Sequence, residues 1–174
     1  KRQIWNLAME GTPYAHPIGG TLNSVPGLAQ KDVVQFFRET YIPQQAVFLI
    51  VGKADPQRLL EESRRALEGW PPGGAGQDLP STSRQGGRKV LILDRPDLTQ
   101  SEIRIALPGV ARQNRRYLAF KLMNYILGGG GFSSWLMERV RSQKGYTYGI
   151  RSSFYALRIP GPLIISTFTP TETT

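Results

Sequence analysis

Residues 126–148 read ILGGGGFSSWLMERVRSQKGYTY, and this stretch decides how the second half of the chain is organised. The four consecutive glycines interrupt an apolar helical pattern and predict a tight turn or a mobile loop. Either serine of the following pair can cap a short helix that runs to about Arg141, and Gly145 is suited to end it. The stretch therefore predicts a helix, a glycine turn, a short helix and a sharp turn in succession.

The segments on either side of this stretch predict an antiparallel sheet. Upstream, residues 115–127 form a helical pattern so apolar that we expect it to be covered on more than one side. Downstream, a strand pair is expected around Pro160-Gly161. Strands are predicted at four segments: 89–93, 101–107, 146–157 and 163–168. Helices and strands are mixed without a regular βαβ rhythm, so the predicted fold class is α+β, an antiparallel sheet with helices packed on one face.

The first part of the chain predicts a separate α+β piece. A Pro/Gly-rich loop over residues 11–20 precedes a helix over residues 31–41. Residues 46–51 have the β-branched and aromatic composition of a buried strand. Asp55-Pro56 then opens a second helix, because aspartate caps free amides and proline suits the first helical position, and Gly69 ends it.

A domain boundary is predicted in the middle of the chain. Residues 71–87 consist mainly of Pro, Gly, Ser, Thr and Gln, which is the composition of a flexible linker. We expect residues 1–70 to be the C-terminal part of a first α+β domain. Residues 88–174 are expected to be the N-terminal part of a second one, truncated because the chain stops just after a strand.

Composition and charge narrow the classes of function. The 174 residues include no cysteine, which excludes disulfides and thiolate metal sites. No apolar run is long enough for a membrane span, and the start lacks the apolar run of a signal peptide, so any export signal is expected outside this chain. The formal net charge of +9 favours acidic peptides as partners.

A basic nucleic-acid-binding module is the alternative that this charge leaves open. Such a module would bind DNA or RNA in a salt-sensitive manner. The basic residues gather at positions 112–116 and 139–144, but neither cluster has the interleaved aromatic residues of a stacking platform for single strands. We therefore expect no nucleic-acid partner.

Neither the single histidine nor the glycine run predicts an independent catalytic centre. A catalytic zinc needs about three protein ligands, and His16 stands alone in its loop, which favours a structural or exposed role. A phosphate-binding loop needs a preceding strand and a Lys-Ser or Lys-Thr pair at the start of the next helix. Here a helix pattern precedes the glycines and Phe132 follows them, so no phosphate site is expected.

Residues 126–148 resemble a pattern of the insulinase, pitrilysin and mitochondrial-processing-peptidase family of zinc metallopeptidases. In that pattern a glycine-rich turn, a short helix ending in Leu-Arg, and Glu-Lys-Gly-Leu-Ala-Tyr follow in order. Residues 16–21, 36–43 and 46–56 resemble the close of the family's first domain, so the similarity covers nearly the whole chain. The resemblance implies repeated α+β units of roughly two hundred residues that enclose the substrate between two halves.

The resemblance also implies where the metal belongs. The family's zinc motif, His-x-x-Glu-His, and its more distant glutamate ligand would precede residue 1. Zinc is therefore expected in the full-length assembly, with none bound by this chain. The expected partners are an extended peptide substrate and a missing zinc-bearing half or partner subunit, in the bacterial periplasm or cytoplasm.

The same resemblance assigns two catalytic residues. In the family the second half supplies an arginine and a tyrosine seven positions apart, and these positions are Arg141 and Tyr148 here. A hydroxyl or guanidinium aimed at a peptide carbonyl stabilises the negative charge that builds on its oxygen in a zinc peptidase. The remaining substrate-binding candidates are Tyr146, on the strand face of Tyr148, and the glycine turn: Gly128, Gly129, Gly130, Gly131 and Phe132.

A purely structural role is the alternative for this pair, because arginine in a last helical turn complements the helix dipole and a strand tyrosine ordinarily packs. The sequence departs from the family at Tyr146 and Thr147, which leaves substrate preference open. We expect a fragment of a zinc-dependent endopeptidase that contributes the Arg/Tyr side of a peptide-hydrolysing chamber. The rival reading is a non-catalytic partner subunit of a heteromeric peptidase.

Overall fold

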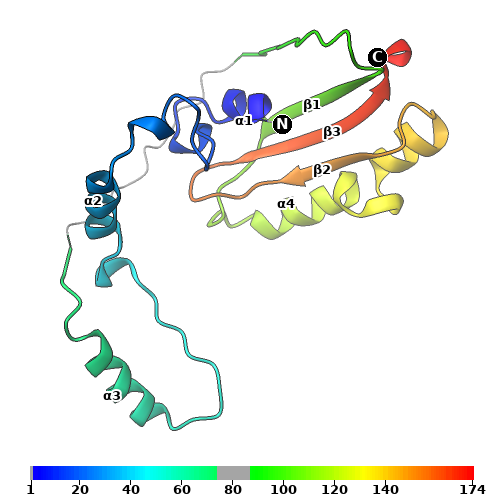
Figure 1. The fold of residues 1–174 in the computed structure, drawn as a ribbon. Helices are drawn as coiled ribbons and strands as arrows, with labels where there is room; N and C mark the ends of the chain where they lie inside the picture. Colours follow the sequence, from blue (N-terminus) through cyan, green and yellow to red (C-terminus); the bar gives the residue numbers. More distant parts are fainter. Residues whose placement is uncertain (1, 74–86) are drawn as a thin grey trace. The chain divides into compact units, whose positions relative to one another are not determined.

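The structure, a computed structural model, describes residues 2–73 and 87–174. These residues form two compact units, one built from residues 2–18 and 87–174 and the other from residues 19–73 (Figure 1). In the two described ranges, no helix has both the length and the apolar character that crossing a membrane requires.

A three-stranded antiparallel sheet forms the centre of the first unit. Its strands are β1 (Gln100–Pro108), β2 (Ile150–Phe154) and β3 (Pro162–Pro170), in the order β1-β3-β2 (Figure 1). The register places Ile105 of β1 and Ser152 of β2 on either side of Ile165 in β3. The predicted hairpin of β2 and β3 is therefore confirmed, although β2 is shorter than the segment expected to form it.

One face of this sheet packs against helical segments. They are α4 (Tyr117–Asn124), the π-helical turns Tyr125–Gly129 and Met137–Gln143, and the 3-10 turn Gly131–Ser133. The rings of Phe120 and Phe154 stack with centroids 5.7 Å apart, and Met137 and Ile150 are buried. Helices on an antiparallel sheet give the α+β class that the sequence predicts.

A short helix, α1 (Arg2–Ala8), lies beside β1 and was not among the predicted elements (Figure 1). Trp5 meets Tyr155 edge-to-face at 5.0 Å between ring centroids, and its indole N–H donates to the backbone oxygen of Tyr14 at 2.6 Å. These contacts fix the N-terminal segment on the same unit as the sheet.

The second unit contains α2 (Gln30–Thr40) and α3 (Pro56–Leu67), and both helices were predicted. Asp55 caps α3 as expected, because its carboxylate accepts a hydrogen bond from the Gln57 amide at 3.0 Å. The indole N–H of Trp70 donates to the Tyr41 backbone oxygen at 3.0 Å. The other 3-10 turns in the described part of the chain are Pro13–Ala15, Val25–Gly27, Pro43–Gln45 and Thr171–Thr173.

Two predicted strands, residues 46–51 and 89–93, are not strands in the structure, so these predictions are wrong. Their side chains are largely exposed, with Val47 at 92% and Ile92 at 85%. A strand is stabilised by hydrogen bonds and side-chain pairs with a neighbouring strand. Among the described residues neither segment has such a neighbour.

The expectation that the helix of residues 115–127 is covered on more than one side is also wrong. Leu118 is 74% exposed and Leu122 is 62% exposed. Only the sheet side of α4 is packed within the described ranges, because no second layer stands against its outer face. The outer face of α4 is thus apolar and is not covered by any of the described residues.

The division into two units differs from the predicted domain boundary in one respect. Residues 2–18 group with the sheet of residues 87–174, whereas the sequence placed them with residues 19–70. Most of the predicted linker, residues 71–87, lies outside the described residues. The predicted domain organisation of a longer protein therefore stays a prediction.

Candidate functional site

The glycine turn is enclosed by two π-helical turns. Tyr125–Gly129 continues α4 into the glycines, and Met137–Gln143 carries the helix that ends near Arg141. π-helical turns are rare and occur frequently at functional sites, where they change which way side chains point. The unusual backbone therefore coincides with the segment that carries the predicted site residues.

Gly128 is required by close packing against the sheet. A Cβ atom at this position would lie 2.6 Å from the Ser152 backbone nitrogen and 2.7 Å from the Ser152 Oγ. The Ser152 hydroxyl also donates to the Asn124 backbone oxygen at 3.3 Å. Because these contacts involve backbone that cannot move easily, the start of the glycine turn is held directly against β2.

Arg141 is half-buried and lies against Phe132. Its guanidinium carbon is 4.9 Å from the centroid of the Phe132 ring, within the range of a cation–π contact. The Arg141 backbone oxygen accepts the Gly145 amide at 3.0 Å, and Gly145 has a φ of +67°. Glycine thus ends this helix by adopting a left-handed conformation, as the sequence predicts.

Thr147 anchors the loop that follows, a role that the sequence did not reveal. Its side chain is buried, and its hydroxyl donates to the Phe168 backbone oxygen of β3 at 2.6 Å. The Thr147 hydroxyl oxygen in turn accepts hydrogen bonds from the Gly149 amide at 3.0 Å and from the Thr167 hydroxyl at 2.9 Å. The loop is thereby tied to β3 by a buried polar cluster.

The tyrosines on either side of Thr147 point away from this anchor. Tyr146 is 47% exposed and Tyr148 is 88% exposed. Tyr148 precedes β2, which begins at Ile150, so its predicted position on a strand is wrong. The sequence carried no distinctive local signal for the anchor, because its partner Thr167 lies on β3 and recognising the pair required knowing that the loop and β3 are adjacent.

The structure brings some of the predicted site residues together. Phe132 and Arg141 are in contact, and Gly128 and Gly131 shape the turn that precedes Phe132, Gly131 with a φ of +67°. Within the described ranges, Arg141 and Tyr148 form no hydrogen bond with each other. Trp135, 67% exposed beside this turn, is a further aromatic candidate that the sequence reading did not include.

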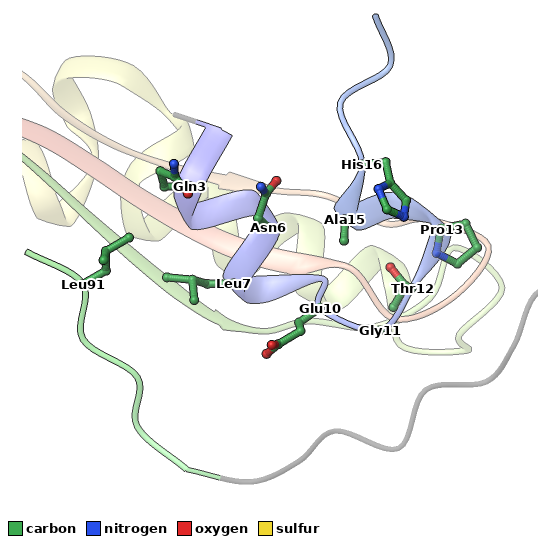
Figure 2. Close-up of a pocket in the computed structure, with 10 residues that line it drawn as sticks. All are labelled: Gln3, Asn6, Leu7, Glu10, Gly11, Thr12, Pro13, Ala15, His16 and Leu91. Carbon is green, nitrogen blue, oxygen red and sulfur yellow. The ribbon is translucent and has the colours of Figure 1, made fainter. Parts of the chain in front are cut away.

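The residues present do not fit a zinc site. His16 lines an open cavity of about 720 Å³ beside α1, together with Glu10 and uncharged residues such as Asn6 and Thr12 (Figure 2). No group of three or more His, Cys, Asp or Glu residues lies close enough to hold a metal ion in residues 2–73 and 87–174. A structural zinc takes four protein ligands and a catalytic zinc about three, which this set does not supply.

The chain thus contains an α+β unit with a segment, from Arg141 to Tyr148, that the Thr147 hydroxyl anchors to β3. The described residues contain no group of side chains that could hold a metal ion. The family model described as the peptidase M16 inactive domain matches residues 28–174. This chain therefore belongs to the peptidase M16 family, as its resemblance to zinc metallopeptidases predicts.

Some relatives of this chain are named as zinc proteases, and another is named as a non-peptidase homolog. The chain is 31% identical over 144 residues to an uncharacterized zinc protease of Streptomyces coelicolor, which covers 78% of this chain and 30% of the relative. It is also 31% identical over 147 residues to the non-peptidase homolog YmxG of Helicobacter pylori, covering 82% of this chain and 33% of the relative. The chain thus spans about a third of the length of these relatives.

Solved structures share the fold. The crystal structure of a peptidase M16 inactive domain from Pseudomonas fluorescens superposes with a TM-score of 0.83 at 25% identity, covering 98% of this chain and 41% of that one. A protease from Helicobacter pylori gives a TM-score of 0.80 at 18% identity, covering 97% and 42%. These likenesses support the α+β class.

Proposed function

We propose that this chain forms the substrate-binding side of a zinc-dependent M16 endopeptidase, with Arg141 and Tyr148 as the groups that contact the peptide. The observation that carries this proposal is the exposed Tyr148 hydroxyl at the end of a loop anchored by the buried Thr147. A tyrosine that only stabilised the fold would pack its ring against neighbours. An exposed ring on a fixed loop is instead arranged to meet another molecule.

The chemistry of the two side chains fits an extended peptide. The Arg141 guanidinium can donate two hydrogen bonds to a substrate carbonyl, and the Tyr148 hydroxyl can donate one. The Phe132 ring beneath Arg141 limits the orientations that the guanidinium samples. Donors held in place before the substrate arrives stabilise developing negative charge without a further cost of reorganisation.

The neighbouring candidates act as the wall of this site. Tyr146 is half-exposed next to the anchor, and Phe132 is 73% exposed at the glycine turn. Gly129, Gly130 and Gly131 contribute backbone that a peptide can approach closely, since they carry no side chain, whereas Gly128 is buried against β2 and supports the turn. In this proposal zinc belongs to another part of the assembly, consistent with residues 2–73 and 87–174 holding no group of three or more potential metal ligands.

A non-catalytic partner subunit is the second candidate. Its specific support is the likeness to a relative named a non-peptidase homolog and to a domain described as inactive. In that case the same segment would act beside a zinc-bearing subunit, or would hold a peptide without cleaving it. Both proposed functions use the same peptide-binding segment. They differ in whether the zinc site belongs to the same protein or to a separate subunit.

Peptidase activity of the full-length protein with added zinc tests the proposal. On an unstructured peptide, Arg141→Ala and Tyr148→Phe should each lower kcat/KM about tenfold or more, which corresponds to roughly 1.4 kcal/mol of transition-state stabilisation. Arg139→Ala, on the same helical segment, and Tyr41→Phe, in the other unit, are matched controls that should keep full activity.

Each outcome assigns a different role. Activity that appears only when a second protein is added identifies a partner subunit. Full activity in both folded site variants would show that Arg141 and Tyr148 are structural residues, and the proposed site would be abandoned.

A further inference from the structure

A second cavity, of about 580 Å³, lies between α1 and the face of the sheet and has no part in the function proposed above. All the residues that line it belong to the first unit. Pockets that bind small molecules typically measure about 300–1,000 Å³ and combine apolar walls with a few polar groups. The size and composition of this cavity both fall within that description.

Its floor is a row of polar side chains set by the strand register. Ser166 of β3 is paired with Arg104 of β1 on one side and with Arg151 of β2 on the other. Directly paired residues of antiparallel strands project from the same face of the sheet. Two arginines therefore flank one serine hydroxyl, and all three side chains line the cavity.

The positive charge of this row is only partly compensated. Arg104 is 17% exposed and pairs with Glu102 through one nitrogen, while its Nε is buried without a hydrogen-bond partner. Arg151 and Arg2, which also line the cavity, form no ion pair within the described ranges, and no acidic residue is part of the lining. A buried donor without a partner is costly, so an anion that accepts from these guanidinium groups would be stabilised.

Apolar side chains line the same cavity and form what we call its apolar wall. Among them are Ile4 and Trp5 of α1 and Ile164 of β3. The Trp5 ring is held by its contact with Tyr155 and by its hydrogen bond to the Tyr14 backbone oxygen. The cavity thus combines an apolar surface with the arginine row.

We propose that this cavity binds a carboxylate joined to an aromatic or aliphatic body. The carboxylate accepts hydrogen bonds from Arg151 and Arg104, whose planar guanidinium groups match its geometry. The apolar body lies against Trp5. A singly charged head suits a site in which Glu102 already neutralises part of Arg104.

Isothermal titration calorimetry of the full-length protein tests this site with three probes: 3-phenylpropionate, its neutral amide and inorganic phosphate. We expect the carboxylate to bind at least tenfold more tightly than either of the others. Arg151→Gln should weaken carboxylate binding at least tenfold, while Arg115→Gln, which removes the same charge from an exposed position outside the cavity, should not. Arg151 is exposed, so its replacement should leave the thermal unfolding temperature unchanged, and this is checked in parallel.

Three results would overturn the proposal. The first is no carboxylate binding, or binding that Arg151→Gln leaves unchanged. The second is equal binding of the acid and the amide, which would remove the role of charge. The third is phosphate binding as tight as that of 3-phenylpropionate, which would remove the role of the apolar wall.

Discussion

Replacing Thr147 by valine is the sharpest test of how the site is held in place. Valine keeps the shape of threonine but removes the hydroxyl that joins the loop to β3. That hydroxyl donates to the Phe168 oxygen and accepts from the Gly149 amide and the Thr167 hydroxyl. Thr147 is only 6% exposed, so these hydrogen bonds are made away from bulk solvent on the Thr147 side.

The expected cost follows from what each partner loses. The Thr167 hydroxyl also lies 3.0 Å from the Gly149 oxygen and can donate there instead. Gly149 itself is exposed, so water can partly replace the partner of its amide, and losing that hydrogen bond costs a net amount of about 0.5–1.5 kcal/mol. The lost bond to the Phe168 oxygen adds a similar amount, so we expect Thr147→Val to destabilise this loop by about 1–3 kcal/mol.

Amide hydrogen exchange at Gly149 measures this local stability directly. A loss of about 2 kcal/mol should accelerate exchange roughly 30-fold, since about 1.4 kcal/mol is a factor of ten. Thr147→Ser, which keeps the hydroxyl and loses one methyl group, should cost only about 0.8 kcal/mol. If Thr147→Val left Gly149 exchange unchanged, the polar cluster would not anchor the loop and the argument for a fixed Tyr148 would fail.

Two further predictions concern packing and charge. Gly128→Ala should destabilise the first unit by about 1–3 kcal/mol in denaturant unfolding, because the new Cβ meets backbone, whereas Gly69→Ala, with no atom within 4 Å, should change stability by less than about 1 kcal/mol. The pKa of Asp97 lies below its ordinary value because its carboxylate accepts hydrogen bonds from Arg95, so Arg95→Gln should raise that pKa in an NMR titration. A carboxyl group whose pKa is lowered by folding stabilises the folded state at pH values above its unfolded-state pKa. This stabilisation disappears as the pH falls through the folded-state pKa. An Asp97 titration that did not respond to Arg95→Gln would contradict this assignment.

The sequence predicted the parts of the fold that depend on neighbouring residues. Asp55 and the proline after it define the start of α3, and the turn around residues 160–161 joins β2 to β3 as expected. These features need only local backbone preferences and apolar periodicity. Local signals of this kind remain valid whatever the rest of the chain does.

The failures all involve partners that are distant in sequence or absent. Residues 46–51 and 89–93 have strand-like composition, yet strand formation depends on a neighbouring strand, which the described residues do not offer. The outer face of α4 has an apolar pattern without a layer to cover it. The composition of a segment indicates whether it is suited to pack as a strand or an apolar helix face. It does not indicate whether a neighbouring strand or layer is present to pack against.

In the candidate site, too, local sequence patterns predict some residues, whereas contacts between residues distant in sequence go unpredicted. Arg141 and Tyr148 were predicted from a family pattern that runs continuously along the chain, whereas Thr147 acts through β3, some twenty residues away in sequence. A threonine between two tyrosines has no distinctive local pattern. Its role becomes visible only when the buried hydroxyl is seen among the partners of β3.

The segment between Gly128 and Thr147 is therefore fixed at both ends, and this bears on how Arg141 can work. Gly128 rests on the backbone of β2, and Thr147 is hydrogen-bonded to β3. Since β2 and β3 are paired strands of one sheet, the two anchors cannot drift apart independently. Arg141 lies between them on a helical segment and is further restrained by Phe132. A binding group held in this way loses little conformational freedom when a ligand arrives, so the peptide-binding role proposed for Arg141 would benefit from its place on a doubly anchored segment rather than on a free loop.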